Sequence, residues 1–358
     1  MRIVITGASG NVGTALLRRL ARCDETHDIA GIVRRPPAPL DGYRAVRWHS
    51  IDVAEPTAGD ELATAFDGAD SVVHLAWGFQ PTHDTEYLRR VAIGGTAAVV
   101  DAAHRAGVGQ LVHMSSVGTY AAGSYGRRVD ESWPTTGISS SPYSRHKSVV
   151  EAFLTEYQQH YGDAAVRIAR LRPGFILQAS AASGLLRYAL PGYLPMSLVP
   201  LLPLLPMDRS LCIPVVHADD VADAVVRVIE RQATGAFNVA GEPPVGRDQV
   251  ARALGAQPVH VPSAVLGGIV DATWRLRLQP VDRGWLDMAF TVPLLDCARA
   301  RTELEWSPQW SATDALADLL TGVAHHAHTS SPPLRPRSVI DLVRRSFTDG
   351  LISSRHLP

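Results

Sequence analysis

The sequence is short of cysteine and of net charge, and each shortage excludes a class of protein. Its three cysteines, Cys23, Cys212 and Cys297, are odd in number and far apart, so they form neither a disulfide framework nor a metal-spaced cluster. The formal net charge is −1 over 358 residues, without a basic stripe, which argues against nucleic acid as a main partner. No group of carboxylates, histidines and cysteines has the spacing of metal ligands, so we expect no metal site.

A long uninterrupted hydrophobic run is also missing. The most apolar stretch, residues 185–206, contains Arg187 and five prolines, so it cannot form a membrane-spanning helix. The chain starts directly on the strand-like sequence MRIVITG, without the basic and apolar regions of an export signal. We therefore expect a cytoplasmic protein with reduced thiols and no membrane partner.

Lysine is nearly absent. Of the 34 basic residues, 33 are arginine and one is Lys147. An arginine excess of this size indicates a bias in coding composition. The one lysine that remains therefore needs a chemical explanation.

The first half of the chain alternates short β-branched runs with longer helical segments. We predict strands at residues 2–6, 29–33, 44–48, 71–75, 110–114 and 166–171, and helices at residues 12–22, 60–66, 86–106 and 143–160. Alternation of this length requires right-handed crossovers, which produce a doubly wound parallel sheet of the α/β class with helices on both faces. Ligands of such sheets bind beyond the carboxyl ends of the strands.

The sequence TGASGNVG follows the first strand and opens the first helix, with Gly7, Gly10 and Gly13 three residues apart. Gly7 permits a tight exit from the strand, Gly10 lets backbone amides approach a pyrophosphate, and Gly13 lets the helix pack close to the sheet. The helix N-terminus, which includes Asn11 and Val12, supplies partial positive charge to the phosphates. This strand–turn–helix context indicates a dinucleotide-binding site.

The second strand ends in Arg34 and Arg35, with no acidic residue to hold an adenosine ribose 2′-hydroxyl. Guanidinium groups suit a 2′-phosphate in geometry and charge, so the pattern favours NADP(H), with NAD(H) as the alternative. We expect further cofactor contacts after the third and fourth strands, at the adenine and at a ribose. The residues at these places are Asp52, Val53, Leu75, Ala76 and Trp77.

The sequence YSRHK places Tyr143 and Lys147 four residues apart, on one face of a helix that Ser141 can cap and Pro142 can begin. A free phenol has a pKa of about 10, and a neighbouring ammonium group lowers it. Tyr143 can then give a proton to a carbonyl oxygen as hydride arrives, or take one from an alcohol as hydride leaves. Lys147 would also hydrogen-bond the nicotinamide ribose. Ser116, just beyond the fifth strand, would position the substrate oxygen.

These motifs together resemble the extended short-chain dehydrogenase/reductase superfamily, in its NAD(P)-dependent epimerase/dehydratase-like branch. The matching pieces span residues 3–240 in the order of the family, and residues 296–308 extend the match to about residue 323. They are the glycine motif, Asp52-Val53, His74-Leu75-Ala76, Ser115-Ser116, Tyr143-x-x-x-Lys147, Arg172-Pro173-Gly174 and HADDVA at residues 217–222. The resemblance implies that Ser116, Tyr143 and Lys147 form the catalytic triad. It also implies that backbone after Pro173 faces the nicotinamide carboxamide.

A change in composition after Pro173, where residues 175–212 are rich in Leu, Pro and Ser and show no clear period, predicts a division of the chain. We expect a Rossmann-type dinucleotide-binding domain of residues 1–174 and 213–240, with late strands at residues 213–216 and 236–239 around a helix at residues 219–231. Residues 175–212 and 241–324 would form a smaller, mostly helical substrate-binding lobe. Residues 325–358 would be a linker and a short tail helix.

Departures from the family pattern bear on the substrate. Dehydratases of this branch carry an Asp-Glu pair directly after the triad hydroxyl, where this chain has Val117 and Gly118, so sugar dehydration is disfavoured. The apolar residues 185–206 suit a lipophilic substrate better than a nucleotide diphosphate, although packing against the core or a second subunit explains them equally well. The candidate substrate contacts are Trp77, Phe79, Ser116 and Arg187.

The function predicted from the sequence is an NADP(H)-dependent oxidoreductase that interconverts a ketone and a secondary alcohol on a small, largely apolar metabolite. The first alternative is an NAD(P)-dependent sugar-nucleotide epimerase, which oxidises and re-reduces one carbon. The second is a non-catalytic NADP-binding sensor or scaffold, which the Tyr143–Lys147 pair disfavours. The expected partner is a small-molecule substrate, and a homodimer is left open.

Overall fold

The centre of the molecule is a parallel sheet, seen in a computed structural model that describes residues 1–358 apart from residues 24, 79–84, 190–202, 280 and 337–358. Within these residues the sheet has seven strands in the order β12-β7-β5-β4-β1-β2-β3, and every neighbouring pair is parallel. The strands are β1 (Arg2–Thr6), β2 (Asp28–Val33), β3 (Arg47–Ser50), β4 (Ser71–His74), β5 (Gln110–Met114), β7 (Arg167–Pro173) and β12 (Gly235–Val239). This order confirms the predicted doubly wound α/β fold of the Rossmann type.

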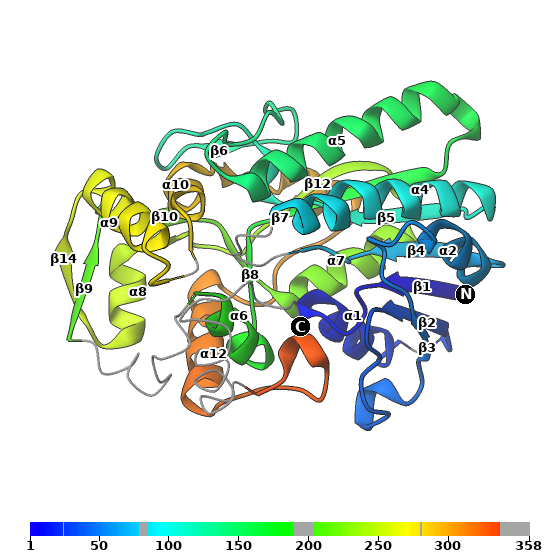
Figure 1. The fold of residues 1–358 in the computed structure, drawn as a ribbon, viewed down its shortest axis with the longest axis horizontal. Coiled ribbons are helices and arrows are strands. Elements are labelled where there is room, and N and C mark those ends of the chain that lie inside the picture. The colour runs from blue at the N-terminus through cyan, green and yellow to red at the C-terminus, as the bar shows by residue number, and fades with distance from the viewer. Residues whose placement is uncertain (24, 79–84, 190–202, 280, 337–358) are drawn as a thin grey trace.

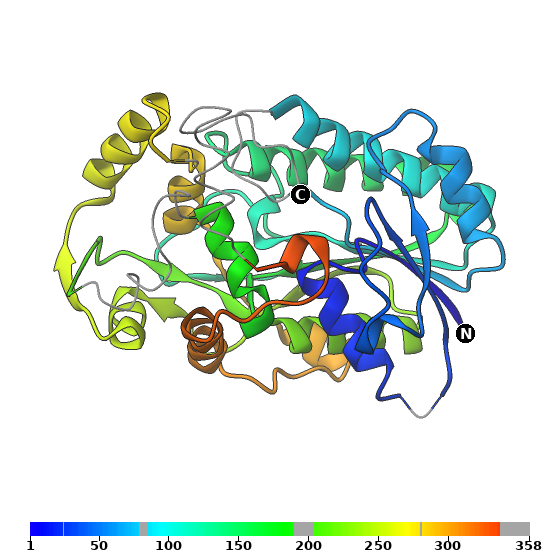
Figure 2. The same ribbon diagram turned by 60° about the horizontal axis from the view of Figure 1, so that its bottom comes forward.

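Helices cover both faces of the sheet (Figures 1 and 2). One face carries α2 (Ala58–Phe66), α4 (Gly95–Arg105) and α5 (Pro142–Tyr161), and the other carries α1 (Asn11–Leu20) and α7 (Ala218–Glu230). Because side chains alternate along a strand, Val4, Val72 and Leu111 pack toward the first group of helices, whereas Ile5, Val73 and Val112 pack toward the second. Both faces are thus buried, as the near-continuous apolar runs in these strands require.

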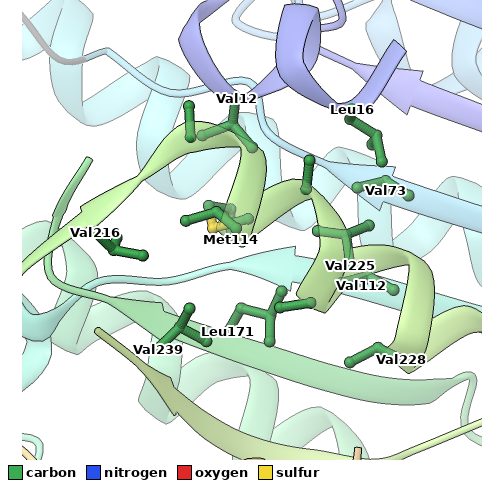
Figure 3. Close-up of a cluster of buried hydrophobic side chains, with 14 of the residues drawn as sticks. Val12, Leu16, Val73, Val112, Met114, Leu171, Val216, Val225, Val228 and Val239 are labelled. Carbon is green, nitrogen blue, oxygen red and sulfur yellow. The ribbon is translucent and has the colours of Figure 1, made fainter. Parts of the chain in front are cut away.

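Figure 3 shows the second of these cores. Val12 and Leu16 of α1 and Val225 and Val228 of α7 lie over side chains of the central strands. The strand residues labelled there are Val73, Val112, Leu171 and Val239, with Met114 at the end of β5. This packing holds the start of α1, and with it the glycine-rich turn, against the carboxyl ends of the strands.

Three predicted elements differ from the structure. The strand expected at residues 213–216 is two short strands, β10 (Cys212–Ile213) and β11 (Val215–His217), with Pro214 between them. The strand expected at residues 44–48 begins at Arg47, because the chain first passes through a 3₁₀ turn (Asp41–Tyr43) whose Tyr43 carbonyl accepts a hydrogen bond from Trp48 Nε1 at 3.0 Å. The helix expected at residues 86–106 is α3 (Thr85–Arg89), the π-helical turn η2 (Arg90–Gly94) and α4. Apolar periodicity does not detect the extra residue of a π turn.

The remaining elements follow β7 and lie mostly at one end of the sheet (Figure 1). They are β8 (Phe175–Leu177), α6 (Ala182–Ala189), β9 (Leu204–Met207), β10 (Cys212–Ile213), β11 (Val215–His217), β13 (Val245–Gly246), α8 (Arg247–Leu254), β14 (Gln257–His260), α9 (Ser263–Arg275), α10 (Arg283–Thr291), β15 (Leu294–Leu295), α11 (Ala298–Glu303) and α12 (Ala312–Ala324). β6 (Arg128–Val129), from the first half of the chain, pairs with β15. In the described part of the chain, none of the helices combines the length and apolarity needed to cross a bilayer.

The boundary between the dinucleotide-binding domain and the substrate-binding lobe stays a prediction. Two segments predicted to lie outside the dinucleotide-binding domain nevertheless pack against it. Trp306, within the predicted lobe, is 1% exposed in the core beneath the sheet and donates from Nε1 to the Asp220 carbonyl at 2.9 Å. The segment that follows α12 returns to the glycine-rich turn through the short 3₁₀ helix η7 (Pro332–Leu334). The predicted tail helix lies outside the described residues.

Candidate active site

The glycine-rich turn is shaped by close backbone contacts. Gly7 has a φ of +72°, and a Cβ there would lie 2.8 Å from the backbone nitrogen of Ala76. A Cβ at Gly13 would lie 2.4 Å from the Ala8 carbonyl oxygen. Side chains at either position would therefore displace the end of β4 or the start of α1. The turn keeps backbone, rather than side chains, facing the space beyond the sheet.

One cavity of about 380 Å³ runs from this turn to Tyr143. The structure brings every predicted cofactor and triad residue to its walls. These are Gly7, Gly10, Asn11, Val12, Gly13, Arg34, Arg35, Asp52, Val53, Leu75, Ala76, Trp77, Ser116, Tyr143, Lys147 and Pro173. A long cavity with a bare backbone turn at one end and titratable side chains at the other fits a dinucleotide. Their individual roles in binding and catalysis stay predictions.

The arginine end of the cavity is a connected polar group. Arg34 Nη1 donates to the Tyr87 hydroxyl at 2.7 Å, and that hydroxyl donates to Asp52 Oδ2 at 3.4 Å. Burial, together with the guanidinium groups of Arg34 and Arg335, lowers the pKa of Arg35. Positive charge is thus concentrated beside the end of β2, as the NADP(H) prediction requires. Tyr87 was not predicted, because nothing in its sequence neighbourhood links it to the second strand.

Helix α5 carries the predicted Tyr–Lys pair on its inward face. Ser141 caps the helix by accepting a hydrogen bond from the Ser144 backbone nitrogen at 3.3 Å, and Pro142 is its first residue. Both features were predicted from the sequence. Tyr143, Lys147 and Glu151 follow one another at successive turns, and this face is directed into the molecule: Lys147 is 2% exposed and Glu151 1%.

Lys147 lies in the cavity wall and is turned away from bulk solvent. Its Nζ donates to the Met114 carbonyl oxygen at 2.7 Å and lies 3.3 Å from the centroid of the Trp77 ring. The ring face therefore supports the ammonium group by a cation–π interaction. Burial lowers the pKa of Lys147 well below its usual value, while the Glu151 carboxylate acts in the opposite direction.

The sequence led us to expect that Lys147 lowers the pKa of Tyr143, and here the structure differs. Burial raises the pKa of Tyr143 to about 12, and the hydrogen bond with the Ser116 hydroxyl opposes that rise. The reason is the position of the lysine, whose Nζ lies 6.0 Å from the centroid of the Tyr143 ring and is directed toward Met114 and Trp77. At neutral pH the Tyr143 phenol therefore keeps its proton.

Ser116 is oriented by the turn that follows β5. Its Oγ accepts a hydrogen bond from the Gly118 backbone nitrogen at 3.0 Å, which leaves the hydroxyl proton available to the Tyr143 oxygen. Ser144 Oγ donates to the Gly118 carbonyl at 2.5 Å and so ties this turn to α5. Ser116 and Tyr143 are thus held next to each other from two different elements.

A buried ion pair lies behind the triad. Glu151 accepts hydrogen bonds from Arg172 Nε and Nη2, both at 2.9 Å, and from the Ser115 hydroxyl at 2.6 Å. Arg172 also donates to the Tyr120 hydroxyl at 3.0 Å. Charge-assisted bonds lower the pKa of Glu151 despite its burial, so the carboxylate stays ionised. The network joins α5, β7 and the β5 turn that carries Ser116.

The other end of the cavity is apolar. Met288 of α10 lines it beside Tyr143, and the Trp285 ring centroid lies 5.2 Å from that of Tyr143. Ile176 and Leu177 of β8 and Leu185 of α6 also line the cavity, but the Ile176 carbonyl accepts a hydrogen bond from Asn11 Nδ2 at 3.2 Å, so β8 lies beside the glycine-rich turn. Met288 and Trp285 were not predicted, because only tertiary packing brings α10 to the start of α5. Of the predicted substrate contacts, Trp77 and Ser116 are in the cavity wall, whereas Phe79 and the Arg187 side chain lie outside the described part of the structure. No three potential metal ligands gather among the residues that the structure describes.

The fold and the shape of the cavity define a chain of the extended short-chain dehydrogenase/reductase type. The chain belongs to the NAD dependent epimerase/dehydratase family, whose model matches residues 3–177. L-Arabinose 1-dehydrogenase (NAD(P)(+)) of Haloferax volcanii is 31% identical over 188 residues, which make up 50% of this chain and 68% of that protein.

Other relatives share parts of the chain or its fold. The 3-beta-hydroxysteroid dehydrogenase of Mycolicibacterium neoaurum is 29% identical over 182 residues, or 49% of this chain and 47% of that protein. An uncharacterized protein of Mycobacterium bovis is 25% identical over 348 residues, which are 96% of this chain but 33% of that protein, so the chain spans about a third of its length. The crystal structure of a UDP-glucose 4-epimerase from Thermotoga maritima, with UDP-glucose, has a TM-score of 0.68 at 16% identity, covering 91% of this chain and 99% of that one. This likeness shows the fold.

Proposed function

We propose that the chain is an NADP(H)-dependent oxidoreductase that interconverts a ketone and a secondary alcohol on a small, largely apolar substrate. The observation that carries this proposal is the hydrogen-bonded Ser116–Tyr143 pair, located where the cavity changes from backbone and arginine walls to apolar ones. A bound nicotinamide supplies hydride transfer. The protein supplies a proton donor and a place for the substrate oxygen.

Tyr143 acts as the general acid in ketone reduction. Its raised pKa keeps the proton on the phenol at neutral pH. When a ketone is bound, the Ser116 hydroxyl turns its one proton from the phenol oxygen to the substrate carbonyl oxygen and so holds that oxygen beside Tyr143. In alcohol oxidation the same groups work in reverse, and the phenol must first lose its proton. Lys147, on the same helix face, lies in the cavity wall with the cofactor residues, where it would hydrogen-bond the nicotinamide ribose.

The apolar end of the cavity supports a lipophilic substrate. Met288 and the ring of Trp285, both beside Tyr143, offer few hydrogen-bond partners, and a sugar diphosphate would require several. The relative from Mycolicibacterium neoaurum, a hydroxysteroid dehydrogenase, acts by its name on a lipophilic alcohol. The arginines at the end of β2 support NADP(H) as the cofactor.

The test is a turnover assay with NADPH and a panel of cyclic and aryl ketones, for the wild type and for Tyr143→Phe. We expect Tyr143→Phe to bind NADPH with unchanged affinity and to lose turnover by about 10²- to 10⁴-fold, because the acid is removed and the ring is kept. Tyr125→Phe, at a tyrosine that is 69% exposed, is the control. A Tyr143→Phe protein that keeps most of its rate would contradict the acid/base role. Interconversion of UDP-hexoses without added cofactor would instead establish the epimerase.

A further inference from the structure

The segment after α12 folds back onto the glycine-rich turn. Ser331 is completely buried, and its hydroxyl donates to the Ser9 carbonyl oxygen at 2.7 Å across 322 positions of sequence. Ser9 lies inside the motif between Gly7 and Gly10. Figure 2 shows this orange-red segment between the blue helix α1 and the green helix α6. The C-terminal part of the chain is therefore bonded to the motif that defines the dinucleotide site.

Residues 331–335, here called the C-terminal strap, are held at both ends. Before the strap, the Thr329 hydroxyl accepts a hydrogen bond from the Tyr43 hydroxyl at 3.3 Å, in the connection between β2 and β3. At its far end, the Arg335 carbonyl accepts a bond from the Ser183 hydroxyl of α6 at 3.0 Å. A Cβ added at Gly184 would lie 3.1 Å from the Pro333 carbonyl, so the strap and α6 are in close contact. These contacts join the nucleotide-binding half of the molecule to α6, whose Leu185 lines the cavity.

The strap also forms part of the cavity wall. Pro332, Pro333 and Leu334 line the same space as Ser9, Gly10 and Arg35. Leu334 is 4% exposed and its backbone nitrogen donates to the Ser331 carbonyl at 3.1 Å, so the wall is a structured turn. Arg335 adds positive charge next to Arg35. The strap therefore lines the cavity beside the glycine-rich turn, where the phosphates of a dinucleotide would bind.

We propose that the strap is a wall of the cofactor site that slows the release of a bound dinucleotide. This inference rests on the proposed NADP(H) dependence. Because Ser331 is bonded to the turn itself, opening the cavity along this side requires that the bond to Ser9 break and that Leu334 leave its buried position. Each of these changes raises the free-energy barrier to release. A cofactor held only by the turn and the β2 arginines would leave without this added barrier. The strap therefore affects how long the cofactor stays in its site.

The test measures NADPH release from the full-length protein by stopped-flow fluorescence, with excess unlabelled NADP⁺ as the displacing ligand. We expect release from Ser331→Ala to be about 5- to 10-fold faster than from the wild type, the size expected for one neutral hydrogen bond. Ser330→Ala changes the neighbouring serine, which is exposed, and should release NADPH at the wild-type rate. Equal rates for the two variants would overturn the proposal.

Two more measurements keep the proposal testable if Ser331→Ala is poorly folded. Ser183→Ala and Tyr43→Phe remove the other two bonds and leave the Ser331–Ser9 bond in place, and each should speed release by a smaller factor. Hydrogen exchange should show that NADPH protects the backbone amides of residues 329–335 in the wild type, and the absence of added protection would contradict the proposal. A wild-type protein that binds neither NADPH nor NADH would overturn the proposed function and the strap together. Binding with identical release rates in all variants would overturn the strap alone.

Discussion

At the scale of single residues, the proposed preference for NADP(H) over NAD(H) depends on Arg35. Its guanidinium lines the cavity, and the neighbouring charges of Arg34 and Arg335 lower its pKa together with burial. Concentrating like charges in this way costs stability unless an anion is bound there. The sequence predicts an NADP(H) site here from the absence of an acidic residue after the second strand, and the structure brings both arginines to the cavity wall.

We expect Arg35→Ala to weaken NADPH binding by at least about 10-fold and to leave NADH binding nearly unchanged, since only NADPH carries the 2′-phosphate that a charge-assisted bond would hold. Fluorescence titration with each dinucleotide measures the two affinities. Arg44→Ala, at an exposed arginine outside the cavity wall, is the matched control. Equal losses for the two dinucleotides would refute a 2′-phosphate site at Arg35.

Gly118 is the residue that leaves room for the Ser116–Tyr143 pair. A Cβ there would lie 3.1 Å from Tyr143 Cε1, 3.2 Å from Met288 Sδ and 3.4 Å from Ser116 Oγ. Gly118→Ala should therefore lower kcat by about 10-fold or more through displacement of the phenol, because small misplacements of reacting groups are costly. NADPH affinity should stay within about 2-fold, as for a group outside the cofactor contacts. Gly268→Ala, in α9, meets no atom within 4 Å and should leave kcat unchanged.

At the scale of elements, α5 carries both the Tyr143–Lys147 pair and a carboxylate, Glu151, that anchors the helix to the sheet. Its inward face carries Tyr143, Lys147 and Glu151, and Glu151 is bonded to Arg172 of β7 and to Ser115 after β5. A helix anchored to two neighbouring strands in this way holds Tyr143 and Lys147, the residues with proposed catalytic roles, at fixed positions. The ion pair is buried, so each partner depends on the other.

Glu151→Gln should lower the free energy of unfolding by about 3 kcal/mol, because Arg172 is left as a buried cation without its anion. Urea unfolding followed by circular dichroism gives this value. Glu156→Gln changes an exposed carboxylate of the same helix and should have little effect. If the two variants were equally stable, the buried pair would contribute nothing to the fold.

The elements also show what a single sequence can predict. β1 and β5 were predicted at their observed residues, and α5 within one residue at each end, because a short strand-like run and a Ser-Pro cap are local signals. That the predicted triad and the glycine turn lie in the wall of one cavity could be predicted for the same reason, since each follows directly from a strand or a cap. Met288, Tyr87 and the strap could not, because they reach the cavity through contacts between segments far apart in the chain.

At the scale of the whole molecule, buried histidines make stability depend on pH. His74 is 1% exposed between Thr6 and Thr96, and burial and the charge of Lys147 lower its pKa to about 3. The same causes lower the pKa of His113. The unfolded chain binds a proton at each histidine below a pH of about 6.5, and the folded chain does not. Acid therefore favours unfolding.

For each of the two histidines, the free energy of unfolding should fall as pH decreases below 6.5, by up to about 1.4 kcal/mol per pH unit, because only the unfolded chain takes up the proton. Urea titrations at pH 7.5, 6.5 and 5.5 measure the slope. His74→Gln should reduce this slope by the contribution of one proton, whereas a substitution of the exposed His160 should leave the slope unchanged. A slope unaffected by His74→Gln would mean that His74 is protonated in the folded state.

The rarity of lysine has a practical consequence for spectroscopy. Reductive methylation with ¹³C-formaldehyde labels primary amines, and this chain has a single side-chain amine, at Lys147. The labelled dimethylamine would give one side-chain resonance, from a nitrogen 2.7 Å from a main-chain oxygen and above an indole ring whose current shifts the signal. Titrating dinucleotides or ketones against that resonance would report occupancy and protonation at the centre of the cavity without any assignment of the spectrum.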